Sequence, residues 1–289
     1  MSQGNQNKPI LYSSTASQWA YVPHLALLEK GYRTEEYDVV DIDLVTAKNL
    51  EPNYLEINPH GTIPSLKSPF LATPLVDSVE ILEYLDRSRP AATQLIPSDP
   101  ATKARVQQLI ELVHSDQVGT NLILLQARSA EELDGKRKGP WLAFLSNRQA
   151  TLEKYRAENP GHPFYERMTV ENGALLRLYT MKSTPEHAKF YAQTHSQYRD
   201  FAAGMERLNS LLVLPCAAGP SITAADLHIV PWLAHAMWGA GGEDIGDFAH
   251  LEELIAVSVP GFEVGERVKQ WWTNMSQRQS FQECYRSLH

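Results

Sequence analysis

Cysteine is almost absent from this chain, which has only Cys216 and Cys284. Two cysteines exclude a disulfide-rich secreted framework and any zinc or iron–sulfur site built from several thiolates. Basic residues are also in the minority, because 26 Lys and Arg face 34 Asp and Glu and the net charge is −8. Without a cationic surplus, neither nucleic acid nor an anionic membrane surface is an expected partner.

Long apolar runs and targeting signals are missing as well. No stretch approaches the roughly 20 apolar residues of a membrane span, and residues 1–8 are polar, without the pattern of a signal or transit peptide. We therefore expect a cytoplasmic protein. What the 289 residues do contain, 43% hydrophobic and 21% charged, is typical of a globular protein with two modest domains.

Strand and helix signals alternate in the N-terminal part. Residues 9–13 are β-biased, residues 22–30 have apolar side chains at helical spacing, and residues 37–44 are β-branched. This order predicts two parallel strands joined by a helical crossover. Two short strands, 63–67 and 73–76, and a helix over 79–87 complete a small α/β domain, residues 1–87.

The remainder of the chain is helical in its periodicity. Three prolines fall within residues 88–100, which we interpret as a linker to an all-helical domain over residues 101–289. Residues 129–183 are the least regular part: 131–139 is polar, and helical stretches around 141–155 and near 171–178 are separated by a break at 159–161. The other predicted helices cover 101–126, 184–212, 222–238, 248–257 and 262–285. The predicted fold class is α/β followed by all-α.

One motif identifies a family. The segment Asn58-Pro59-His60-Gly61-Thr62-Ile63-Pro64 precedes a predicted hairpin, and Asp77-Ser78 opens the helix that follows. In this order the residues make the chain resemble the glutathione transferases, which implies a thioredoxin-like N-terminal domain, an all-helical C-terminal domain and glutathione as cofactor. The resemblance covers the chain ends, residues 9–85, 221–233 and 259–285. Residues 129–183 have no counterpart and are enlarged.

The resemblance assigns residues to the glutathione site. Pro64 is expected to be cis, with Ile63 pairing its backbone with the cysteinyl part of glutathione. Ser78, at a helix N-terminus, is expected to hold the γ-glutamyl carboxylate, and Asp77 the γ-glutamyl ammonium. The family's usual polar residues are missing at Thr62 and Leu50, and Lys48 or Asn53 could replace their contacts with glutathione.

The thiol-activating residue of the family lies between the first strand and first helix, which leaves Tyr12, Ser13, Ser14, Thr15 and Ser17. Counting back without gaps from residues 25–27, Ser17 falls where the zeta class has its catalytic serine. Residues 8–13 and 225–231 also resemble that class. Ser17 is therefore the first choice and Ser14 the alternative, and Ser17 could also be an N-cap.

The predicted chemistry needs no metal. Lowering a thiol pKa from about 8.5 to about 6.5 requires about 2.7 kcal/mol. A hydrogen bond to a charged group supplies about 1.5 to 3 kcal/mol, and a helix N-terminus about 0.3 to 1. A serine that donates to the sulfur is therefore sufficient.

The acceptor site is expected in the helical domain. By resemblance, His114 and Gln117 lie on the helix that lines this site in the family, although a structural role is the more common one for a single residue of this kind. Trp238 stands where zeta enzymes have an arginine linked to the substrate carboxylate, so we expect a larger, more apolar electrophile. Thr223 and Asp226 resemble the family's buried capping box, which is a folding signal.

Three functions follow from the resemblance. The first is a glutathione transferase that adds the thiolate to a bulky apolar electrophile, such as a secondary metabolite. The second is a glutathione-dependent cis–trans isomerase, which shares the same first step. The third is a non-catalytic binding or regulatory protein on the same fold. A homodimer is usual in the family and is considered for this chain.

Overall fold

The computed structural model describes residues 8–288, and the expectation that the chain begins without a leader falls mostly outside this range. Contacts group the described chain into two compact units. Unit 1 contains the residues up to 17, residues 33–77 and residues 125–193, whereas unit 2 contains residues 18–32, residues 78–124 and the chain from 194 onward. The domain boundary placed at residues 88–100 stays a prediction.

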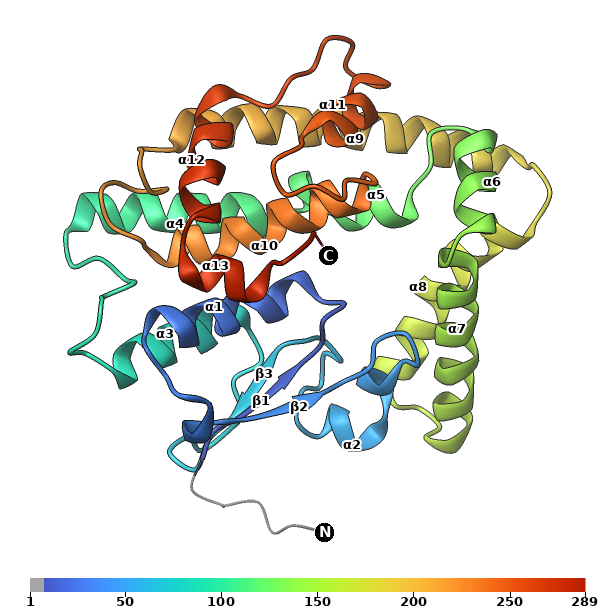
Figure 1. The fold of residues 1–289 in the computed structure, drawn as a ribbon. Coiled ribbons are helices and arrows are strands. Elements are labelled where there is room, and N and C mark those ends of the chain that lie inside the picture. The colour runs from blue at the N-terminus through green and yellow to red at the C-terminus, as the bar shows by residue number, and fades with distance from the viewer. Residues whose placement is uncertain (1–7, 289) are drawn as a thin grey trace. The chain divides into compact units, whose positions relative to one another are not determined.

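Unit 1 is built on a three-stranded sheet in which β1 (Ile10–Ser13) lies between β2 (Asp38–Asp41) and β3 (Ser65–Lys67), as Figure 1 shows. β1 is parallel to β2 and antiparallel to β3, which confirms the predicted parallel pair. The strand predicted over residues 73–76 is reduced to one bridge between Leu66 and Leu75. Pro74 precedes Leu75 and has no N–H with which to extend the ladder.

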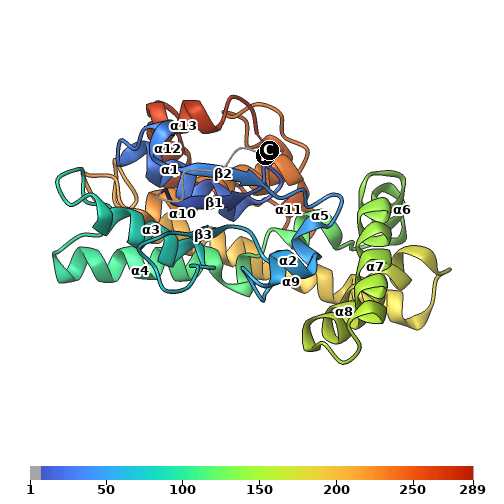
Figure 2. The same ribbon diagram turned by 90° about the horizontal axis from the view of Figure 1, so that it is seen from below.

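The segment without a family counterpart is helical and also belongs to unit 1. It forms α6 (Ala130–Lys138), α7 (Trp141–Glu158) and α8 (Pro163–Thr180). α7 and α8 pack side by side as a helical hairpin, which both views show (Figures 1 and 2). The predicted break at 159–161 is the turn of this hairpin. α6 has no apolar periodicity to predict it, because Leu133 is its one buried residue, although Ser129 caps it by accepting the Glu132 N–H.

The loop between β2 and β3 carries η3 (Lys48–Leu50) and α2 (Pro52–Leu55), and η2 (Thr34–Glu36) precedes β2. A buried apolar cluster joins this loop to the hairpin, with Ala47, Leu50 and Leu55 on one side and Leu152, Phe164 and Tyr165 on the other. The loop therefore packs against the hairpin and not only against the sheet.

Unit 2 is helical. The helix predicted over residues 101–126 is interrupted after His114, because Ser115 is extended and its hydroxyl donates to the Leu112 carbonyl. Residues 262–285 contain two helices instead of one. The elements of unit 2 are η1 (Gln18–Ala20), α1 (Tyr21–Glu29), α3 (Ser78–Ser88), α4 (Pro100–His114), η4 (Asp116–Val118), α5 (Asn121–Leu125), most of α9 (Pro185–Leu211), α10 (Ala224–Gly239), α11 (Ala249–Ala256), α12 (Glu266–Ser276) and α13 (Gln279–Cys284).

The centre of unit 2 is α10, which is buried along almost its whole length. The predicted capping box is confirmed, since the Asp226 carboxylate accepts the Thr223 N–H and the Thr223 hydroxyl. The same carboxylate accepts the Ala217 N–H and the Trp271 indole N–H. Over residues 8–288, no helix is both long and apolar enough to cross a membrane.

Candidate functional site

The two candidate serines lie in the turn that follows β1. The Ser17 N–H donates to the Ser14 carbonyl at 3.1 Å, which closes the turn. The Ser14 side chain is buried, with 4% of the residue exposed, whereas Ser17 is half-buried. The Ser17 hydroxyl donates to the Ile63 carbonyl at 3.1 Å. Of the two serines, Ser17 is thus the one with a hydroxyl shown to face the Ile63 backbone.

The Ile63–Pro64 peptide bond is cis, as expected from the motif. A buried polar network holds the residues on both sides of this bond. The Tyr54 hydroxyl donates to the Thr62 carbonyl at 2.6 Å, and the Asn58 amide donates to the same carbonyl at 2.8 Å. Asn58 also donates to the Ser65 hydroxyl. The carbonyl next to Ile63 is therefore fixed by two donors.

Neither Tyr54 nor Asn58 was predicted as a site residue, although Asn58 opens the motif on which the family resemblance rests. Burial raises the pKa of Tyr54 to about 12, so its hydroxyl remains a donor at neutral pH. Asn58 is completely buried. A fully buried asparagine must find hydrogen-bond partners, and here they are the backbone and side chains of the loop itself.

The other predicted glutathione contacts have mixed exposure. Lys48 on η3 and Asn53 on α2 are exposed, as is Asp77, the residue directly before α3. Ser78 is the first residue of α3 and is buried. Their roles toward glutathione stay predictions.

The candidates in unit 2 each have partners of their own. The His114 Nε2 lies 2.8 Å from the His228 Nδ1, and the His114 ring stacks on Trp19 with centroids 3.9 Å apart. Burial, and to a smaller extent His114, hold the pKa of His228 well below its usual value, so His228 is neutral. Trp19 and His228 were missed by the sequence analysis, and the position of Trp19 two residues after Ser17 was the available signal.

Gln117 and Trp238 differ from His114 in their surroundings. The Gln117 amide donates to the Asp200 carbonyl, and the side chain lies at the surface. Trp238, near the end of α10, is 40% exposed, which is unusual for so large an aromatic residue. Their predicted roles in acceptor binding are not tested by these contacts.

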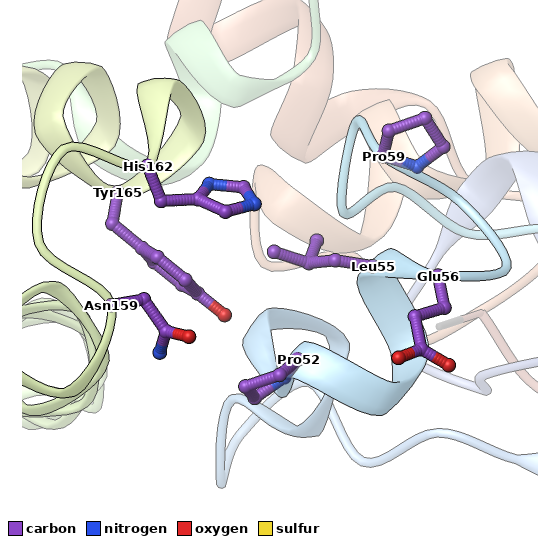
Figure 3. A pocket seen from close by; sticks show the side chains of 7 residues that line it. All are labelled: Pro52, Leu55, Glu56, Pro59, Asn159, His162 and Tyr165. Carbon is purple, nitrogen blue, oxygen red and sulfur yellow. The ribbon is translucent and has the colours of Figure 1, made fainter.

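A pocket of about 270 Å³ opens in unit 1 between α2 and the turn of the hairpin (Figure 3). Apolar and aromatic side chains form much of its wall, and Glu56, Asn159 and His162 add polar groups. Its lining residues are Pro52, Leu55, Glu56, Pro59, Asn159, His162 and Tyr165. None of these was predicted as a site residue. Within residues 8–288 there is no group of three or more His, Cys, Asp or Glu side chains arranged to hold a metal ion.

The chain is similar in sequence to several known proteins. Residues 11–93 match the family described as glutathione S-transferase, N-terminal domain. The chain is 35% identical over 111 residues to the probable maleylacetoacetate isomerase 1 of Drosophila melanogaster. These residues are 37% of this chain and 43% of that protein. It is 32% identical over 154 residues to the zeta class glutathione S-transferase of Euphorbia esula, with coverage of 53% and 65%. The matched stretches thus span less than two thirds of either relative.

Among solved structures, Gtt2 from Saccharomyces cerevisiae has a TM-score of 0.56 at 18% identity, over 95% of this chain and 99% of that one. The sheet, the cis-proline loop and the structural neighbour define the fold class, in which a thioredoxin-like sheet is combined with an all-helical remainder. The sequence matches are more specific than the fold class. Residues 11–93 are thus a glutathione S-transferase N-terminal domain by sequence, and the relatives of the chain include a zeta class glutathione S-transferase.

Proposed function

We propose that this protein binds glutathione and activates its thiol for addition to an electrophilic carbon. The observation that carries the proposal is the hydrogen bond from the Ser17 hydroxyl to the Ile63 carbonyl, 3.1 Å long. In the family, the residue at the Ile63 position pairs with the cysteinyl backbone of glutathione. A cysteine paired there brings its sulfur close to the hydroxyl that now touches the Ile63 carbonyl.

Glutathione binding would exchange the partners of this hydrogen bond. The cysteinyl N–H would donate to the Ile63 carbonyl, which releases the Ser17 hydroxyl to turn toward the sulfur. Both polar groups keep a partner, so the exchange leaves no buried donor or acceptor unpaired. The cost of turning the hydroxyl is therefore small compared with the gain of a charge-assisted bond to the thiolate.

The chemical step is the addition of the thiolate to an activated alkene. The new sulfur–carbon bond uses a sulfur electron pair, and the alkene electrons move onto the conjugated acceptor group. In a transferase, the adduct takes a proton and leaves as a conjugate. Asp77, Ser78, Lys48 and Asn53 are proposed as further contacts with glutathione, since the family resemblance assigns or permits each.

Cis–trans isomerisation is the second candidate. The relative from Drosophila melanogaster is named as a maleylacetoacetate isomerase, which favours this outcome. The adduct would rotate about the former double bond and expel the thiolate, so glutathione would be regenerated. Trp238 and the ring of Trp19, which stacks on His114, support a bulky apolar acceptor for either reaction, in place of a small dicarboxylate.

Two measurements test the proposal. Glutathione is first titrated into the wild type, Ser17→Ala and Ser14→Ala, and the thiolate absorbance is recorded across neutral pH. We expect bound thiolate in the wild type and in Ser14→Ala and its loss in Ser17→Ala. Glutathione that binds but stays protonated in the wild type would point to a binding protein, and no binding would refute the proposal.

Product analysis then separates the two reactions. With an activated alkene that has cis and trans forms, a transferase consumes glutathione and forms one conjugate per turnover. An isomerase interconverts the alkenes at constant glutathione concentration.

A further inference from the structure

Two adjacent residues of α8 reach the loop that leads to Ile63. The Tyr165 hydroxyl donates to the Leu50 carbonyl at 2.8 Å, and this bond is buried. The Phe164 ring packs on Gly61 so closely that a Cβ on Gly61 would lie 2.7 Å from the Phe164 Cζ. The hairpin thus contacts the loop at two points that are eleven residues apart in sequence.

The two points are linked within the loop. The Asn49 amide donates to the Gly61 carbonyl at 2.7 Å and joins η3 to the stretch before the cis proline. Asn49 is buried, with 4% of the residue exposed. A displacement of η3 would therefore be passed on to Gly61, which is followed by Thr62 and Ile63.

The tyrosine hydroxyl is a defined point of attachment. Burial raises the pKa of Tyr165 to about 12, with a smaller contribution from Tyr155, so the hydroxyl keeps its proton at neutral pH. The Tyr165 side chain also lines the pocket between α2 and the hairpin turn (Figure 3). At this point the loop is held by the hydrogen bond and by the apolar cluster formed with the hairpin.

We infer that Tyr165 and Phe164 are positioning residues, which hold residues 47–63 in the geometry that binds glutathione. The inference rests on the proposed function. Lys48 and Asn53 flank the Leu50 carbonyl in sequence, and Ile63 follows Gly61 by two residues. The enlarged segment of this chain therefore acts on the cofactor loop.

The test compares two tyrosines of the same helix. Tyr165→Phe removes the hydroxyl that holds Leu50, and Tyr179→Phe removes a buried hydroxyl that donates at 2.7 Å to the Leu125 carbonyl instead. The two variants lose the same kind of bond, so they should lose similar stability. We expect Tyr165→Phe alone to raise the KM for glutathione, by about three- to tenfold, with kcat at saturation nearly unchanged.

Amide hydrogen exchange in the absence of glutathione provides a second readout. Residues 47–63 should exchange faster in Tyr165→Phe than in the wild type or Tyr179→Phe. Unchanged exchange and unchanged KM in Tyr165→Phe, or equal changes in both variants, would overturn the inference. If the wild type does not bind glutathione, the proposed function fails, and the exchange experiment still decides whether the hairpin holds the loop. Phe164→Leu replaces Tyr165→Phe if the latter does not fold.

Discussion

Removal of the Ser17 hydroxyl should shift the pH dependence of the reaction by a calculable amount. Ser17→Ala deletes one hydrogen bond to the thiolate, which is worth about 1.5 to 3 kcal/mol. At about 1.36 kcal/mol per pKa unit, the pKa of the bound thiol should rise by about 1.1 to 2.2 units. The half-buried position of Ser17 places the expected shift toward the lower part of this range.

The direction of the pKa shift determines the pH range in which the two enzymes should differ. A hydrogen bond to the thiolate lowers the thiol pKa, so its loss moves the acid limb of the rate profile to higher pH. If the wild-type thiol has a pKa of about 6.5, the thiolate fraction of Ser17→Ala at pH 6.5 should fall by roughly 7- to 80-fold. Well above both pKa values, the two enzymes should converge, because the thiol is then ionised in each.

The assay is kcat/KM for an activated alkene at saturating glutathione, measured from acidic to alkaline pH, because this ratio reports the ionisation of the glutathione-bound enzyme. Ser14→Ala is the matched control, since it removes a serine hydroxyl from the same turn, where Ser14 is linked to Ser17 through its carbonyl. A Ser17→Ala profile that is lowered equally at every pH would refute thiol activation by this residue. A shift of the same size in Ser14→Ala would refute its assignment to Ser17.

Three further predictions concern the loop and the hairpin. Asn58→Ala removes the buried donor to the Thr62 carbonyl and should cost about 1 to 3 kcal/mol of unfolding free energy, measured by denaturant titration. Gly61→Ala adds a Cβ at a φ of +62° and 2.7 Å from Phe164, so it should lower both the Tm and glutathione affinity; Phe164→Leu in the same chain should restore part of the loss. Burial lowers the pKa of Lys136 to about 8. The unfolded chain therefore binds more protons between about pH 8 and 10.5, stability should rise with pH across that window, and Lys136→Met should remove this rise in Tm.

Local signals in the sequence were sufficient for several elements of the fold. The β-biased residues 9–13 and the β-branched residues 37–44 predicted the parallel strands, and the capping residues Thr223 and Asp226 predicted the start of α10. These features depend on residues close together in the chain, where side-chain spacing and capping act directly. The predictions were less accurate where tertiary packing intervenes, as at Ser115, where a side-chain hydrogen bond ends a helix whose apolar periodicity continues.

The site was predictable only as far as a motif covers it. Ile63, Pro64 and Ser17 were predicted as site residues from the family resemblance, and in the structure the Ser17 hydroxyl donates to the Ile63 carbonyl. Tyr54 was missed because a buried tyrosine has the same appearance in sequence as any core aromatic residue. Its function as a donor to the Thr62 carbonyl exists only once the loop has closed around it.

The sequence by itself predicted the fold class, the cis-proline motif and Ser17 as the first-choice serine in the turn after β1, because each prediction depends on a short stretch of chain. The tertiary structure alone decided what the enlarged segment contacts. Tyr165 lies more than a hundred residues from Leu50, and no spacing rule joins them. Their contact arises because both elements have an apolar face to bury, and the buried Leu50 carbonyl then needs a donor, which Tyr165 provides.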